Sequence, residues 1–186
     1  MRTLTSLCVG ATLAGGVLSA ACGSTLGPPA AASANVIDTS TLYAASGTPV
    51  GTPSAYNVQT NERVRTDTTP AFDFLFDMTG STARLYPPGS LPGLARSAAL
   101  QYAASFDGTV TAPTGGWNDT TSLSIDSGTV VLVRSRAVTC QYGATVFEYA
   151  KLQILTLDTI ARTISFQILA NTNCGYRDLN IGLPKH

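Results

Sequence analysis

Two carboxylates on one expected strand are the first residues whose types and spacing suggest chemistry. Asp73 and Asp77 lie four residues apart in a segment where apolar side chains alternate with other residues. Such a pair could serve as an acid and a base, or as ligands for Ca²⁺. Residues four apart on a strand are separated by about 13 Å, which is too far to share one ion or one bond. We therefore expect both to be solvated side chains on the outer face of a sheet.

Three cationic side chains form a second candidate group. Arg134 and Arg136 share one face of an expected strand, and Lys151 belongs to the next strand along the chain. These residues could form an anion-binding site. Alternatively, they are outward charges that protect a sheet from edge-to-edge pairing.

The single tryptophan is a third candidate. Trp117 follows Gly115 and Gly116 in a polar loop. A tryptophan in such a loop could stack on a sugar or fill a pocket of a partner. Alternatively, it plugs the end of a β core.

Signatures of known catalytic sites are missing from the sequence. It contains no GxSxG motif, no HExxH motif and no phosphate-binding glycine loop, and its only histidine is His186. Hydrolysis by carboxylates stays an alternative, because it needs only two acids that converge in a cleft. We expect no catalytic residues, no metal and no cofactor.

The first 22 residues resemble the signal of a bacterial lipoprotein. After Arg2, the stretch 4–18 carries no charge and is too short and too rich in Gly, Ala and Thr for a permanent membrane span. It closes with the run Leu18-Ser19-Ala20-Ala21-Cys22, in which Ser19 stands where such signals usually have Leu. The resemblance implies a signal peptide at 1–21 and a lipid on Cys22. It also implies export to the bacterial cell envelope, to the outer membrane or cell surface. Cleavage without lipid attachment is the alternative.

The cysteine count fits the same compartment. Cys8 leaves with the signal and Cys22 carries the lipid, so only Cys140 and Cys174 remain. Two thiols in an exported domain favour one disulfide. A metal or redox site would need CxxC spacing or nearby histidines.

Composition indicates one exported domain of low charge. The chain has 186 residues with 11 basic and 11 acidic side chains, and loss of Arg2 with the signal leaves 10 and 11. This balance does not favour nucleic-acid binding. Residues 22–35 are rich in Gly, Pro, Ala and Ser, which predicts a flexible tether, and 36–186 form one β domain.

Alternation of side chains predicts the strands. The clearest candidate in the first half contains Phe72, Phe74, Phe76 and Met78, followed by a turn at 79–81 and a second strand to Tyr86. Weaker candidates are 41–43 and 57–65. The segment 94–106 is rich enough in alanine for a helix, but Leu100, Tyr102 and Ala104 alternate as in a strand, which is the interpretation we favour.

The C-terminal third predicts an antiparallel meander. Its three β-rich runs are 129–136, 146–157 and 163–170. Cys140 follows the first run and Cys174 the third, so a bridge would tie the loops at one end of the meander. We predict an all-β protein, a single antiparallel β-sandwich or barrel-like domain with a C-terminal three-stranded meander.

The meander resembles the closing strands of HmuY-like haem-binding lipoproteins. The likeness rests on the runs 129–135, 149–155 with its Tyr-Ala-Lys-Leu string, and 164–167. It implies a lipid-anchored, mostly β protein, and the founding members of the family hold haem iron with side-chain ligands. An axial pair of histidines is impossible within this chain, because His186 is the only histidine and Met78 the only methionine after the signal.

Together these features predict a lipid-anchored binding or structural module of the cell envelope without catalytic activity. Its partners are the membrane, through the lipid, and an envelope protein, a glycan or a small ligand. Its candidate contacts are Trp117, Arg134, Arg136 and Lys151. A haem-binding lipoprotein and a carboxylate-dependent hydrolase are the alternatives.

Overall fold

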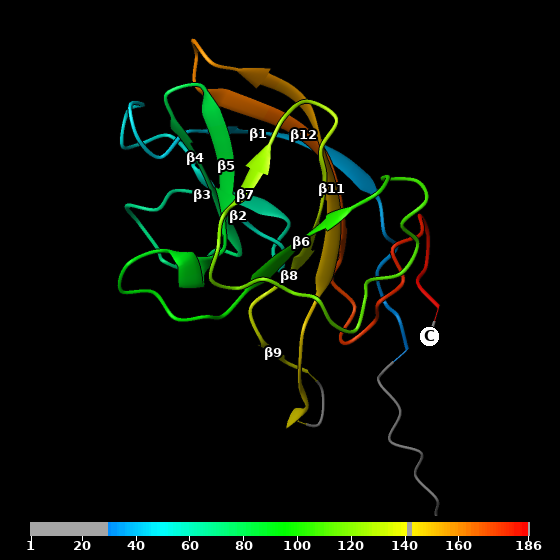
Figure 1. Ribbon diagram of the computed structural model, residues 1–186. Coiled ribbons are helices and arrows are strands. Elements are labelled where there is room, and N and C mark those ends of the chain that lie inside the picture. The colour runs from blue at the N-terminus through cyan, green and yellow to red at the C-terminus, as the bar shows by residue number, and fades with distance from the viewer. Residues whose placement is uncertain (1–29, 141–142, 186) are drawn as a thin grey trace, which may run out of the picture.

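Two antiparallel five-stranded sheets pack against each other as a β-sandwich (Figure 1). The computed structural model describes residues 30–140 and 143–185. The meander sheet has the order β1-β12-β11-β8-β6 and comprises β1 (Ile37–Tyr43), β6 (Ala99–Ala103), β8 (Val130–Arg134), β11 (Tyr149–Asp158) and β12 (Thr163–Asn171). The hairpin sheet has the order β3-β2-β4-β5-β7 and comprises β2 (Ala55–Asn57), β3 (Glu62–Val64), β4 (Phe74–Thr79), β5 (Thr82–Tyr86) and β7 (Leu123–Ile125). A hairpin of β9 (Val138–Thr139) and β10 (Thr145–Val146) and a 3-10 turn, η1 (Pro88–Ser90), complete the elements. The all-β prediction is confirmed.

The predicted meander forms the centre of its sheet. β8 pairs with β11, and β11 pairs with β12, both antiparallel, with a bulge in β11 between Ile154 and Thr156. β1 joins the outer side of β12, and β6 joins the outer side of β8. The alternation that predicted these strands arises because one face of the sheet is buried against the other sheet.

Phe74 and Phe76 of β4 fill the space between the sheets, as predicted, whereas Phe72 precedes the strand and packs with Leu75 on the outer face of the hairpin sheet. Phe74 and Phe76 are fully buried and Met78 is 2% exposed. The rings of Tyr56 and Phe74 from the hairpin sheet meet Phe166 of β12, with centres 5.6 to 6.1 Å apart. Such aromatic pairs add about 0.5–1.5 kcal/mol each beyond the burial of their surface.

Loops cover the outer face of each sheet and create two further apolar clusters. On the meander sheet, Phe106 and Ala112 of one loop and Leu179 of the C-terminal segment pack on Val130 and Leu132. On the hairpin sheet, the loop after β5 contributes Leu91 and Leu94 to a cluster with Leu75. The sandwich therefore has buried residues on both faces of its central strands.

Two local expectations differ from the structure, and a third is confirmed for part of its segment. The segment 57–65 is a hairpin of β2 and β3 rather than one strand, because Asn61 turns the chain with a φ of 54°. Within 94–106 the strand interpretation is confirmed for Ala99–Ala103, which form β6. Part of the segment assigned to the tether contacts the domain, since the backbone N–H groups of Ala32 and Ser33 donate to Asn173 Oδ1.

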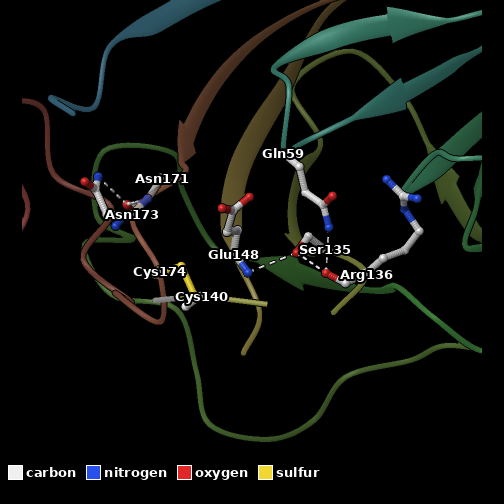
Figure 2. Close-up of a disulfide and its surroundings, with 8 residues drawn as sticks. All are labelled: Gln59, Ser135, Arg136, Cys140, Glu148, Asn171, Asn173 and Cys174. Atoms are coloured by element: carbon white, nitrogen blue, oxygen red, sulfur yellow. Dashed lines mark hydrogen bonds between the residues drawn. A yellow bond between two sulfur atoms is a disulfide. The ribbon is translucent and has the colours of Figure 1, made fainter. Parts of the chain in front are cut away.

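The predicted disulfide between Cys140 and Cys174 is present, with the two Cα atoms 5.9 Å apart. It joins the β9–β10 hairpin to the loop after β12 at one end of the meander (Figure 2).

Across 30–140 and 143–185, no helix has the length and apolar character needed to span a bilayer.

Candidate functional site

Arg134 lies between two aromatic rings on the outer face of the meander sheet. Its guanidinium carbon is 4.5 Å from the ring centre of Phe147 and 5.7 Å from that of Trp117. Trp117 also packs against Tyr149, with ring centres 5.8 Å apart. We call these four residues the arginine–aromatic cluster. All four are half-buried, so the cluster forms part of the molecular surface.

Arg134 has no carboxylate partner among the residues that the structure describes. The ion pairs in that part of the chain join Arg65 to Asp67, Arg136 to Asp73 and Arg162 to Asp77. The Nε atom of Arg134 is buried and has no hydrogen-bond partner there. Aromatic faces attract cations, so the two rings hold the guanidinium in place while its charge stays uncompensated.

The loop that carries the tryptophan is fixed to the edge strand β6. Leu100 N–H donates to the Asn118 carbonyl at 2.8 Å, and Asn118 N–H donates to the Leu100 carbonyl at 3.0 Å. Gly116 has a φ of 82°, and a Cβ atom there would lie 3.0 Å from Gln101 Nε2. The positive φ favours glycine at this position, and a larger residue would also displace the end of the Gln101 side chain. The indole therefore has a defined position beside β8 and β11.

Both interpretations of Trp117 apply to the structure in part. The ring packs against the apolar cluster on the outer face of the meander sheet, as a plug would. Its Nε1 donates to the Pro113 carbonyl at 3.2 Å. The side chain is only partly buried, so that part of it reaches the surface beside Arg134.

Lys151 lies on the same sheet face, but its ammonium group is hydrogen-bonded to a loop. The residue is 4% exposed, and its Nζ donates to the carbonyls of Phe106 at 2.8 Å and Thr109 at 3.0 Å. Burial lowers the pKa of Lys151, and the charges of Asp107 and Asp178 oppose this shift. Lys151 thus anchors the loop that covers the sheet.

Arg136, which follows β8, pairs with Asp73 beside the hairpin sheet and so joins the two sheets. Its backbone N–H donates to Asp73 Oδ1 at 2.7 Å and its Nε to the same oxygen at 3.2 Å, while Val58 N–H donates to Asp73 Oδ2 at 2.7 Å. Asp73 is completely buried. The prediction that Asp73 is solvated is wrong, because Val58 and Arg136, from segments distant in sequence, cover its carboxylate. Asp77, within β4, keeps a quarter of its side chain exposed.

The prediction that these cations protect a sheet edge is wrong as well. β8 lies between β6 and β11, and β11 lies between β8 and β12, so neither strand is an edge. The structure brings Trp117 and Arg134 together, whereas Arg136 and Lys151 each make separate structural contacts.

Glu148 is a second buried acid near Asp73. The residue is 7% exposed, and its Oε2 has no hydrogen-bond partner among the described residues. Its backbone N–H donates to Ser135 Oγ, which donates to the Arg136 carbonyl (Figure 2). Burial, with a smaller contribution from the negative charge of Asp73, raises the pKa of Glu148 from 4.5 to about 7.

We expect stability to fall as the pH rises from 4.5 to 7, because folded Glu148 keeps a proton that the unfolded chain releases. The loss is roughly 3 kcal/mol across this window, at 1.36 kcal/mol per pKa unit. Glu148→Gln should remove the loss, which urea unfolding at pH 5 and pH 8 measures. The exposed Glu62→Gln variant is the matched control and should behave as wild type. An equal change in unfolding free energy with pH in Glu148→Gln and wild type would contradict the attribution of the loss to Glu148.

Sequence reasoning missed Phe147, Tyr149 and Glu148 as members of these sites. Phe147 and Glu148 belong to the predicted run 146–157, but the structure places them in the connection between β10 and β11, outside either strand. Tyr149 could have been found from the predicted antiparallel pairing, because it lies directly opposite Arg134 on the neighbouring strand. Within the described ranges, no group of three or more His, Cys, Asp or Glu side chains is placed to hold a metal ion.

The predicted signal peptide, Cys22 and His186 lie outside the described residues. Comparison with known proteins gave no match: no family model, no curated protein and no solved structure is similar to this chain.

Proposed function

We propose that the chain is a lipid-anchored binding module of the bacterial cell envelope without catalytic activity. Residues 1–22 support the export and the lipid on Cys22. The Cys140–Cys174 disulfide is consistent with an oxidising compartment outside the cytoplasm.

The observation that carries the binding role is the partly exposed Arg134, whose guanidinium lies over the rings of Trp117 and Phe147. A fixed cation without a carboxylate partner favours a ligand that brings a carboxylate or phosphate. The exposed part of the neighbouring indole favours a flat apolar surface on the same ligand, such as the face of a sugar ring. An acidic glycan of the envelope combines both features.

The alternatives find less support in the same part of the structure. Met78 lies inside the sandwich core at 2% exposure, which disfavours it as a ligand to haem iron. Asp73 directs both carboxylate oxygens at donors from Val58 and Arg136, which disfavours it as a nucleophile or a general base.

We expect an acidic oligosaccharide to change the fluorescence of Trp117 saturably, because the chain has one tryptophan and it lies in the cluster. Oligogalacturonate is the probe, and neutral dextran of the same size is the comparison. Arg134→Gln should lower the affinity at least tenfold, the loss expected from about 1.4 kcal/mol of a charge-assisted contact.

Arg63→Gln on the exposed face of β3 is the matched control and should bind as wild type. Equal titrations of Arg134→Gln and wild type would contradict the site. The absence of a saturable change with the acidic glycan would reject this ligand class.

A further inference from the structure

Exposed apolar side chains gather where the chain enters the domain. The described residues include nine exposed large hydrophobic side chains, and three of them lie around the bridge between Asn35 and Gly182. These are Val36 at 54% exposure, Ile181 at 69% and Leu183 at 60%. We call these three residues the entry surface. Single exposed apolar residues are ordinary, but a group of them marks an interaction site.

An antiparallel bridge holds the two halves of the entry surface together. Asn35 N–H donates to the Gly182 carbonyl at 2.8 Å, and Gly182 N–H donates to the Asn35 carbonyl at 2.9 Å. Asn35 itself is buried. Side chains on either side of such a pair point to the opposite face, so Val36 lies beside Ile181 and Leu183 on the solvent side. Figure 1 shows the start of the first strand next to the C-terminal segment.

Side-chain amides fix this entry point to the domain. Asn173 Oδ1 accepts from the N–H groups of Ala32 and Ser33, and Asn173 Nδ2 donates to the Ser33 carbonyl. Asn35 Nδ2 donates to the carbonyls of Asp178 and Asn180. The chain before Ala32 therefore leaves the domain beside the entry surface.

We propose that the entry surface docks on the bilayer that holds the lipid of Cys22. This inference rests on the lipid anchor of the proposed function. Cys22 precedes Ala32 by ten residues, which span at most about 35 Å when fully extended. A connection of that length keeps the entry surface close to the membrane, so that a weak apolar contact becomes effectively intramolecular. The bilayer is thus the apolar phase nearest to these three side chains.

Quenching of a single tryptophan by brominated phosphatidylcholine tests the docking. In a Trp117→Phe background, the reporter is placed by Leu183→Trp on the entry surface or by Ile160→Trp in the β11–β12 turn. Ile160 is 94% exposed, and its turn lies at the end of β12 that pairs with Tyr43, away from the entry surface. The chain from Cys22 onward is coupled through that thiol to a maleimide lipid in the vesicles. We expect at least a twofold fluorescence loss for Leu183→Trp and none for Ile160→Trp.

Equal quenching of the two reporters would overturn the proposal. An unquenched Leu183→Trp reporter in a protein that sediments as a dimer would overturn it in favour of a second copy of the chain. Because the protein is coupled chemically to the vesicles, the quenching result does not depend on whether Cys22 carries a lipid in the cell. Mass spectrometry of the exported protein tests the lipid on Cys22, and its absence would reject the anchor but leave the vesicle measurement interpretable.

Discussion

The Asp73→Ala variant should unfold at a much lower denaturant concentration than the wild type. The completely buried carboxylate of Asp73 accepts hydrogen bonds from the backbone of Val58 and from the backbone and side chain of Arg136. Removing it leaves two backbone donors and the Arg136 guanidinium without their partner. Loss of one member of a buried ion pair costs about 3–5 kcal/mol. Urea unfolding at pH 8, monitored by the fluorescence of Trp117, measures this loss.

Asp67→Ala provides the matched control for Asp73. Asp67 also pairs with an arginine, Arg65 at 2.7 Å, but on the exposed surface of the hairpin sheet. Exposed pairs contribute little, so this variant should unfold with the wild type. An Asp73→Ala curve that coincides with the Asp67→Ala curve would show that the link between the sheets is dispensable.

The double variant Cys140→Ser/Cys174→Ser should lose about 4 kcal/mol of stability in the chain-entropy account of disulfides. The bridge closes a loop between residues 34 apart in sequence, and its removal increases the conformational entropy of the unfolded chain. Replacement of both cysteines avoids a free thiol. Thermal unfolding of the oxidised wild type, the reduced wild type and the double variant measures the effect.

Reduced wild type is the control for the serine substitutions and should unfold with the double variant. Unfolding of oxidised and reduced protein at the same temperature would mean that the β9–β10 hairpin and the loop after β12 are held together by other contacts.

The sandwich could be predicted from sequence because its strands carry local patterns. The alternating phenylalanines of β4 and the apolar rows of β11 and β12 face a common core, and alternation reports that face directly. β2 and β3 have three residues each, too few for a period of two to be recognised.

Two residues of the candidate site could be identified from the sequence, but the contact between them could not. Trp117 and Arg134 were both identified, but their contact depends on a loop that pairs with β6 through Leu100 and Asn118. Lys151 and Asp73 were misjudged as solvated charges because segments distant in sequence cover them. Alternation separates the two faces of a strand, but it does not say which outer face a loop will bury.

The asparagine contacts at the entry point also determine how the domain bears mechanical load. A pull on the chain before Ala32 is transmitted through the hydrogen bonds of Ala32 and Ser33 to Asn173. Asn173 precedes Cys174, which is covalently joined to Cys140. Force applied at this end of the domain is therefore shared with a covalent crosslink before it can peel the edge strand β1 away from β12.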